Sequence, residues 1–345
     1  MEYLDSFRGM AISMVVATHA LGYSELTQEN AQLLGFLSRI IAVPAFFLVD
    51  GILFALGHQF SEGLHYGAYI RKSARRLLLP WTIFTLVYCL FRLGFEYMNT
   101  GSAHIVYGQN WRAVLLAGYL SSFSSQMYFL LSLFFIRTAS KITYGMTHAR
   151  PVRQIGIVIV YITLFHALPF QSWFFSGLDP IYHALWGLQF YLIGVAVVPW
   201  IPMLKVPASW LSGAAIAAGL SLASFFDGMG VFVQFILLFG SYLFFLCRPV
   251  QLQLLSSLGQ ISMGIYLLHI PVVMKIFSMV LIRLLSPSTP LFFFVLTTAT
   301  LFTSALFTSL LLQHSFGRVI FGESPRPSSP SISAHDRKFS ASGNP

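Results

Sequence analysis

The chain has 345 residues, of which 56% are hydrophobic and 9% are charged. A soluble domain carries about a quarter charged residues, so this composition excludes an ordinary water-soluble protein. Lys and Arg outnumber Asp and Glu by 20 to 11, and because the basic residues lie mainly between apolar runs, the excess indicates membrane topology and no nucleic-acid partner.

Apolar runs close to the length of a membrane-spanning helix predict an all-α polytopic membrane protein with about ten transmembrane helices. The predicted spans lie near residues 7–22, 38–57, 77–95, 113–137, 154–170, 183–200, 209–226, 230–247, 259–283 and 291–312. With the N-terminus in the cytoplasm, the segments on that side hold most of the basic residues, so both termini are predicted to be cytoplasmic. Residues 1–315 form the predicted membrane domain. Residues 316–345, rich in Ser and Pro, are a predicted disordered cytoplasmic tail.

The first apolar run carries ionisable residues, which are costly inside a membrane and indicate function. Arg8 lies at its water boundary, and His19 follows 11 residues later on the same face, about 16 Å further along a helix. Asp5, one turn before Arg8, is placed to pair with it. Arg8 and His19 are therefore candidate functional residues. In the alternative interpretation, Arg8 only marks the cytoplasmic boundary and His19 is a hydrogen-bonded interior histidine.

Asp50 stands in the middle of the second apolar run, in the segment VPAFFLVDGILF. One interpretation is a structural carboxylate, paired or protonated, that faces the interior of the helix bundle. The other is a catalytic carboxylate that orients or charges a histidine, with His19 as the candidate partner. The sequence does not place the two helices in register, so both interpretations stay open.

Three arginines, Arg71, Arg75 and Arg76, lie within YIRKSARRLLLPW at the start of the third run. They are either topological anchors at the cytoplasmic edge or an electropositive entrance for a cytosolic donor that carries phosphates. Guanidinium groups suit phosphate oxygens because they donate two parallel hydrogen bonds.

The fourth apolar run is interrupted. The polar segment Ser121–Gln126 separates Trp111–Leu120 from Met127–Ile136. The run is therefore either one long helix or a half-helix followed by a crossing, and a broken helix at membrane depth is tolerated only where it lines a cavity.

The ninth run contains GQISMGIYLLHIPVVMK, in which Tyr266 and His269 share one face of a helix, one turn apart. Pro271 removes a backbone hydrogen bond and is expected to bend this helix. Tyr266 and His269 either pack a kinked helix or form the wall of a cavity that holds an acceptor. No motif typical of a metal site, a P-loop, a dinucleotide fold or a GxSxG nucleophile is present, so we expect no metal and no permanently bound cofactor.

Taken together, five segments resemble membrane acyltransferase family 3, whose members O-acylate sugars of bacterial surface polysaccharides, lipid-linked glycans and related molecules. The likeness runs from residue 4 to about residue 312 and is carried by LDSFRGMAISMVVATH, AFFLVDGILF, RKSARRLLLPW, MYFLLSLFF and GQISMGIYLLHIP. One departure concerns the second segment, where the family usually has FF-x-x-SG and Asp50 takes the place of the serine.

The resemblance implies a multi-pass acyltransferase of the bacterial inner membrane, with residues 1–315 as its catalytic domain. Cytoplasmic acyl-CoA, most often acetyl-CoA, is the implied donor, and its phosphates would bind near Arg8, Arg71, Arg75 and Arg76. His19 would act as general base on the hydroxyl of a glycan or lipid-linked saccharide or would carry the acyl group, with Asp50 as its possible partner. Oxyanion stabilisation and acceptor binding would fall to Tyr128, Tyr266 or His269.

A transporter or flippase is the main alternative, because intramembrane His, Asp and Lys residues also relay protons or bind solutes. A non-enzymatic membrane protein, in which buried polar residues only fix helix packing, is the second.

Overall fold

The computed structural model describes residues 2–26, 28–58, 63–98, 105–168, 179–204, 212–213, 215–216, 218, 230–247 and 252–323. These residues are helical or lie in short turns and loops, and none of them forms a strand. The prediction of an all-α protein is therefore confirmed for this part of the chain.

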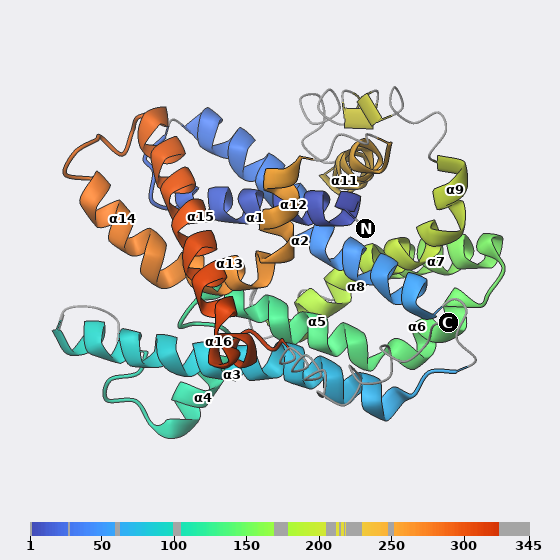
Figure 1. Ribbon diagram of the computed structural model, residues 1–345, viewed down its shortest axis with the longest axis horizontal. Coiled ribbons are helices and arrows are strands. Elements are labelled where there is room, and N and C mark those ends of the chain that lie inside the picture. The colour runs from blue at the N-terminus through green and yellow to red at the C-terminus, as the bar shows by residue number, and fades with distance from the viewer. Residues whose placement is uncertain are drawn as a thin grey trace, which may run out of the picture.

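The longer helices are α1 (Glu2–Leu21), α2 (Gln28–His58), α3 (Tyr66–Met98), α4 (Trp111–Tyr119), α5 (Tyr128–Thr138), α6 (Ser140–Thr147), α7 (Pro151–Ala167), α8 (Pro180–Val197), α11 (Gly230–Cys247), α12 (Gln253–Gln260), α14 (Met274–Leu281) and α15 (Pro290–Gln313). Shorter elements are η1 (Ser125–Met127), η3 (Val198–Trp200), α9 (Ile201–Leu204), α13 (Ser262–Leu268), η4 (His269–Val273) and α16 (Ser315–Ile320). Figure 1 shows their arrangement.

Five stretches in the described residues are long and apolar enough to cross a membrane: Ile41–His58, Tyr66–Met98, Pro180–Leu204, Ser262–Leu281 and Pro290–Gln313. Three shorter apolar helices, Tyr128–Thr138, Pro151–Ala167 and Val233–Cys247, add to them. The chain is therefore a multi-pass membrane protein, whereas the number of about ten spans and the side of the termini stay predictions. Most of the span predicted near 209–226 lies outside the described residues.

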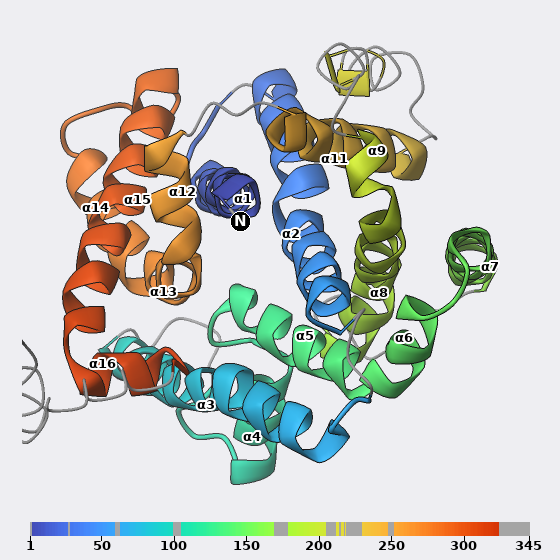
Figure 2. The same ribbon diagram turned by 45° about the vertical axis from the view of Figure 1, so that its right-hand side comes forward.

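Helix α1 occupies the centre of the helix assembly. It packs against α12, α13 and α15 on one side and against α2 and α11 on the other. Figure 2, in which α1 is seen along its axis, shows it between these two groups. Leu4, Phe7, Ile12 and Val16 of this helix are 2% exposed or less. The helix that carries Arg8 and His19 is thus packed inside the bundle, which fixes the positions of both residues.

Two glycines allow α1 and α12 to approach closely. A Cβ atom on Gly9 would lie 1.8 Å from the carbonyl oxygen of Leu255, and one on Gly259 would lie 1.8 Å from that of Asp5. Small residues let two helix backbones come together in this way. The close contact fixes the position of Arg8 relative to the residues that follow α12.

The fourth predicted span is broken, which decides between the two interpretations of the sequence. It consists of α4, a short loop, η1 and α5. The ninth is also broken, because Ile270 leaves the helical conformation with φ −131° and ψ 156° between α13 and α14. Backbone groups released by a break inside a membrane protein need new partners.

The two breaks supply each other's partners. The side-chain amide of Gln126 donates to the carbonyl oxygen of Ile270 at 2.7 Å, and the hydroxyl of Tyr266 donates to the carbonyl oxygen of Gln126. The hydroxyl of Tyr88, from α3, donates to the carbonyl oxygen of Leu267. The bend around residue 270 is thus a supported feature of the fold.

The predicted tail, residues 316–345, begins inside α16, so helix and turn continue to residue 322. Phe321 is 3% exposed and stacks on Phe84 of α3, with ring centroids 6.2 Å apart. Residues 324–345, the remainder of that prediction, lie outside the described residues.

Candidate active site

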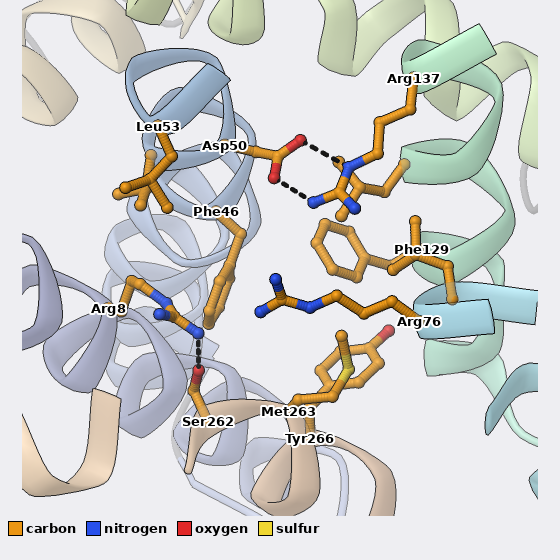
Figure 3. Close-up of a pocket in the computed structure, with 13 residues that line it drawn as sticks. Arg8, Phe46, Asp50, Leu53, Arg76, Phe129, Arg137, Ser262, Met263 and Tyr266 are labelled. Atoms are coloured by element: carbon orange, nitrogen blue, oxygen red, sulfur yellow. Dashed lines mark hydrogen bonds and ion pairs between the residues drawn. The ribbon is translucent and has the colours of Figure 1, made fainter. Parts of the chain in front are cut away.

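A cavity of about 70 Å³ lies where α1, α2, α3, α5 and α13 meet. Three arginines and one aspartate line it: Arg8, Arg76, Arg137 and Asp50. Figure 3 shows these side chains converging from four helices, with Phe46, Phe129, Met263 and Tyr266 forming the apolar part of the wall. A cavity of this volume holds a few water molecules or one end of a larger ligand.

Asp50 and Arg137 form an ion pair across the cavity. Arg137 Nε donates to Asp50 Oδ2 at 3.0 Å, and a second guanidinium nitrogen donates to Oδ1 (Figure 3). Only 14% of the Asp50 side chain and 12% of the Arg137 side chain are exposed. The two-bond geometry is the strong form of an arginine–carboxylate contact. The structure therefore gives Asp50 a partner other than His19, and its predicted catalytic role stays a prediction.

Arg8 is held at the opposite wall. It donates to Ser262 Oγ at 2.9 Å and approaches Asp5 Oδ1 at 3.4 Å, the partner that the sequence predicts. Its side chain is 19% exposed. Arg8 is therefore a fixed cation with part of its guanidinium directed at the cavity, and the pairing of Arg8 with Asp5 is confirmed.

Arg76 is the least engaged of the three cavity arginines. It has no hydrogen bond or ion pair with any residue that the structure describes, although it lines the cavity, and it is exposed. Its guanidinium is thus available to an anionic ligand. Arg71 and Arg75 are also exposed but do not line this cavity, so the structure separates the predicted arginine cluster into one cavity residue and two outer residues.

The cavity is electropositive, because three guanidinium groups face one carboxylate, and Asp5 offsets Arg8 only at the rim. A net positive site favours anions, and guanidinium groups favour phosphate or carboxylate oxygens. No group of three or more His, Cys, Asp or Glu residues able to hold a metal ion occurs in the described ranges.

His19 lies further along α1, away from the arginines, and meets a second histidine. Its ring centroid is 5.2 Å from that of His269, which in turn is 6.0 Å from that of Tyr266. Tyr266 lines the arginine cavity. Tyr266 and His269 therefore lie between the cavity and His19, and the structure brings these three predicted residues together.

Tyr128 lies close enough to Tyr266 for the two phenol groups to interact, but its ring partner lies outside this group. Its ring stacks on His183 of α8, with centroids 4.1 Å apart and planes inclined by 28°. Tyr128 and His19 form no ring contact or hydrogen bond with each other, and the role predicted for Tyr128 stays a prediction.

Comparison with known protein families identifies the family of the chain. A family model described as an acyltransferase domain matches residues 1–309. The chain belongs to membrane acyltransferase family 3. Searches of the curated proteins and of the solved structures found no match. Family membership supports an acyltransferase activity in general and favours it over the transporter interpretation.

Arg137 and Ser262 are the site residues of this acyltransferase that the sequence analysis missed. In the sequence, Arg137 is one basic residue at the predicted cytoplasmic end of a span and Ser262 is part of GQISMGIYLLHIP, and neither pattern singles the residue out. A usable signal existed for Arg137, because an aspartate in an apolar run needs a cation and the basic residues at span ends are the available partners.

Proposed function

We propose that the acyltransferase moves an acyl group, acetyl in the simplest case, from cytoplasmic acyl-CoA to a sugar hydroxyl of a surface polysaccharide or another glycan. We place it in the bacterial inner membrane, with the acceptor either polymeric or linked to a lipid.

The observation that carries the proposal is the cavity in which Arg8, Arg76 and Arg137 converge. Phosphate groups of a coenzyme are among the anions that such a set of guanidinium groups binds well. Arg76 supplies donors that no described residue uses, and Arg8 is already positioned by Ser262. The exposed Arg71 and Arg75 extend the positive charge outside the cavity, where they would raise the local concentration of an anionic donor.

The donor's thioester would lie beyond the cavity, toward His19. Arg8 and His19 share α1, and their spacing corresponds to about 16 Å along the helix axis. Tyr266, which lines the cavity, and His269, whose ring contacts those of Tyr266 and His19, would then flank the thioester. His19 would take the proton of the acceptor hydroxyl or carry the acyl group transiently, and a positioned acid–base group of this kind contributes about 10²–10⁴-fold in rate.

Acetyl-CoA binding tests the donor site. Acetyl-CoA is expected to raise the thermal midpoint of the purified protein in detergent, and Arg76→Gln is expected to abolish most of this shift. Arg71→Gln and Arg75→Gln should reduce it less, because these exposed residues act only through longer-range charge. Arg153→Gln is the matched control, since Arg153 is an exposed arginine of α7 outside the cavity lining. Equal shifts in Arg76→Gln and Arg153→Gln would contradict the donor site.

Acyl transfer itself is tested in cells. Mass spectrometry of surface glycans from a deletion strain is expected to show loss of one acetyl-sized increment, restored by the wild-type gene and not by His19→Ala. Restoration by a normally inserted His19→Ala protein would exclude the central role of His19.

A further inference from the structure

His269 is a fully buried histidine that faces His19. Its side chain is 0% exposed, and the two ring planes are inclined by 52° at a centroid distance of 5.2 Å. His269 stands at the start of the broken segment η4, and Ile270, the residue that leaves the helical conformation, follows directly. Two histidines from segments 250 residues apart are thus brought into ring contact inside the bundle.

The two ring nitrogens of His269 have different surroundings. Nδ1 lies 2.8 Å from the carbonyl oxygen of Tyr266 and 3.1 Å from that of Ile265. A carbonyl oxygen only accepts hydrogen bonds, so Nδ1 is the nitrogen that carries the proton. In the neutral ring Nε2 then holds a lone pair, and it is buried without a hydrogen-bond partner among the residues that the structure describes.

A buried acceptor without a donor is unfavourable, so we expect a hydrogen-bond donor close to Nε2. His19 is such a group, because one nitrogen of its neutral imidazole carries a proton. Within the described residues no carboxylate forms a hydrogen bond or ion pair with His19, and Asp50 is engaged by Arg137. The place that a carboxylate often takes beside a basic histidine is therefore taken by a second imidazole.

We propose that His269 is a positioning residue for His19. Its Nε2 accepts the N–H of His19 through one bridging water molecule and so fixes the tautomer in which the other nitrogen of His19 is unprotonated. This inference rests on the proposed function, in which that nitrogen takes the proton of the acceptor hydroxyl.

The proton balance of the transfer step is then complete. The hydroxyl oxygen attacks the thioester carbon while its proton moves to His19, and the carbon–sulfur bond breaks. The departing thiolate of the coenzyme takes the proton from His19 and leaves as a thiol. The proton between His19 and His269 stays in place throughout, so His269 is unchanged at the end.

Two substitutions of His269 separate positioning from mere structure. In His269→Gln the amide oxygen can reach the place of Nε2, so the acceptor for His19 is kept, whereas the donor to the Tyr266 carbonyl is lost. In His269→Asn the shorter amide can keep the donor near Nδ1 but leaves no acceptor toward His19. Positioning predicts that the glutamine variant works and the asparagine variant fails, while a structural role predicts the reverse.

The experiment measures the rate of coenzyme A release and, independently of turnover, the ¹⁵N NMR signals of His19. Protein labelled with ¹⁵N-histidine is reconstituted in lipid nanodiscs, and the His19 signals are assigned by their loss in His19→Gln. Wild type and His269→Gln are expected to show one protonated and one unprotonated His19 nitrogen, and His269→Asn to show averaged signals. The kcat for release of coenzyme A from acetyl-CoA, measured with glycan extracted from the deletion strain as the acceptor, should fall about 10²-fold in His269→Asn. The KM for acetyl-CoA should stay unchanged because the arginine cavity is intact.

His19 signals that are identical in wild type and in His269→Asn would overturn the proposal, as would an asparagine variant more active than the glutamine variant. Failure of the proposed function looks different. In that case wild type would release no more coenzyme A than His19→Gln, while the ¹⁵N signals of His19 would still respond to His269→Asn.

Discussion

Asp50 and Arg137 neutralise each other inside a cavity that holds two further guanidinium groups. Their pairing leaves two guanidinium groups to face a ligand: Arg8, whose carboxylate partner Asp5 lies 3.4 Å away, and Arg76, which has no ion pair with a described residue. The serine that the resemblance implies at the position of Asp50 would not pair with Arg137 as a carboxylate does, so Asp50 limits how many guanidinium groups an anion meets. The stability of the folded protein should therefore depend on the Asp50–Arg137 ion pair.

Replacing Asp50 by asparagine is expected to destabilise the protein, because Arg137 keeps its charge and loses its partner. Breaking a fully buried pair costs about 3–5 kcal/mol, and the partial exposure of both side chains places this pair at or below the lower end. Thermal unfolding in detergent measures the effect. The double variant Asp50→Asn/Arg137→Gln is expected to be more stable than the sum of the two single losses predicts.

Acetyl-CoA should stabilise Asp50→Asn more than wild type, because its phosphates can then engage Arg137 as well as Arg8 and Arg76. Two results would show that Asp50 does not control the charge of this cavity. One is a double variant whose stability loss equals the sum of the two single losses, and the other is an acetyl-CoA thermal shift that is the same in Asp50→Asn and in wild type.

Among the elements, α1 and α12 are placed by contact between their backbones. The Cβ that Gly9→Ala introduces would meet the Leu255 carbonyl, so the helices must separate and Arg8 must move relative to Ser262. A cost of about 1–3 kcal/mol in unfolding free energy is expected, together with a smaller acetyl-CoA shift. Gly57→Ala in α2 is the control, because a Cβ there meets open space. A normal thermal midpoint in Gly9→Ala would contradict this close packing.

The end of α3 is joined to the following loop by one carboxylate. Glu96, which is 1% exposed, accepts hydrogen bonds from the backbone nitrogens of Ile105, Val106 and Tyr107 at 2.9 Å and from Arg92 at 2.6 Å. Glu96→Ala leaves these donors without their acceptor and should lower the free energy of unfolding by about 1–3 kcal/mol.

Proteolysis of this loop, followed on intact protein in detergent, is expected to be faster in Glu96→Ala than in wild type. It should be unchanged in Glu25→Ala, since Glu25 is an acidic residue outside this group.

The breaks in the fourth and ninth spans show what the sequence can and cannot predict about elements. Polar Ser121–Gln126 and Pro271 indicate the breaks locally. The hydrogen bond from Gln126 to Ile270 joins residues 144 positions apart, and no local pattern encodes the register of two distant helices. For the same reason the sequence identifies Arg8, His19 and Asp50 as candidates but does not pair Asp50 with Arg137, or His19 with His269.

Across the whole molecule, helix ends that the charge pattern assigns to the same side of the membrane lie close together. Arg8, Arg76 and Arg137 stand at three span ends predicted to be cytoplasmic, and they line one cavity. At the other end, the backbone nitrogen of Glu25 donates to the carbonyl oxygen of Pro287 at 2.9 Å, which joins two loops predicted to be outside. The fold is therefore consistent with the topology from the positive-inside rule for these helices.

Labelling of single cysteines in intact cells tests that topology. Cys89 and Cys247 are first replaced by serine, and a cysteine is then introduced at Gly63, where a Cβ meets open space, or at Ser288, which is exposed. A membrane-impermeant maleimide is expected to label Ser288→Cys in intact cells. It should label Gly63→Cys only after the membrane is permeabilised, because the positive charge near residue 63 places that loop in the cytoplasm. The opposite labelling pattern would show that the protein has the opposite orientation in the membrane. The arginine cavity would then lie on the side that cytoplasmic acyl-CoA does not reach. The donor assignment therefore depends on this result as much as on the arginines themselves.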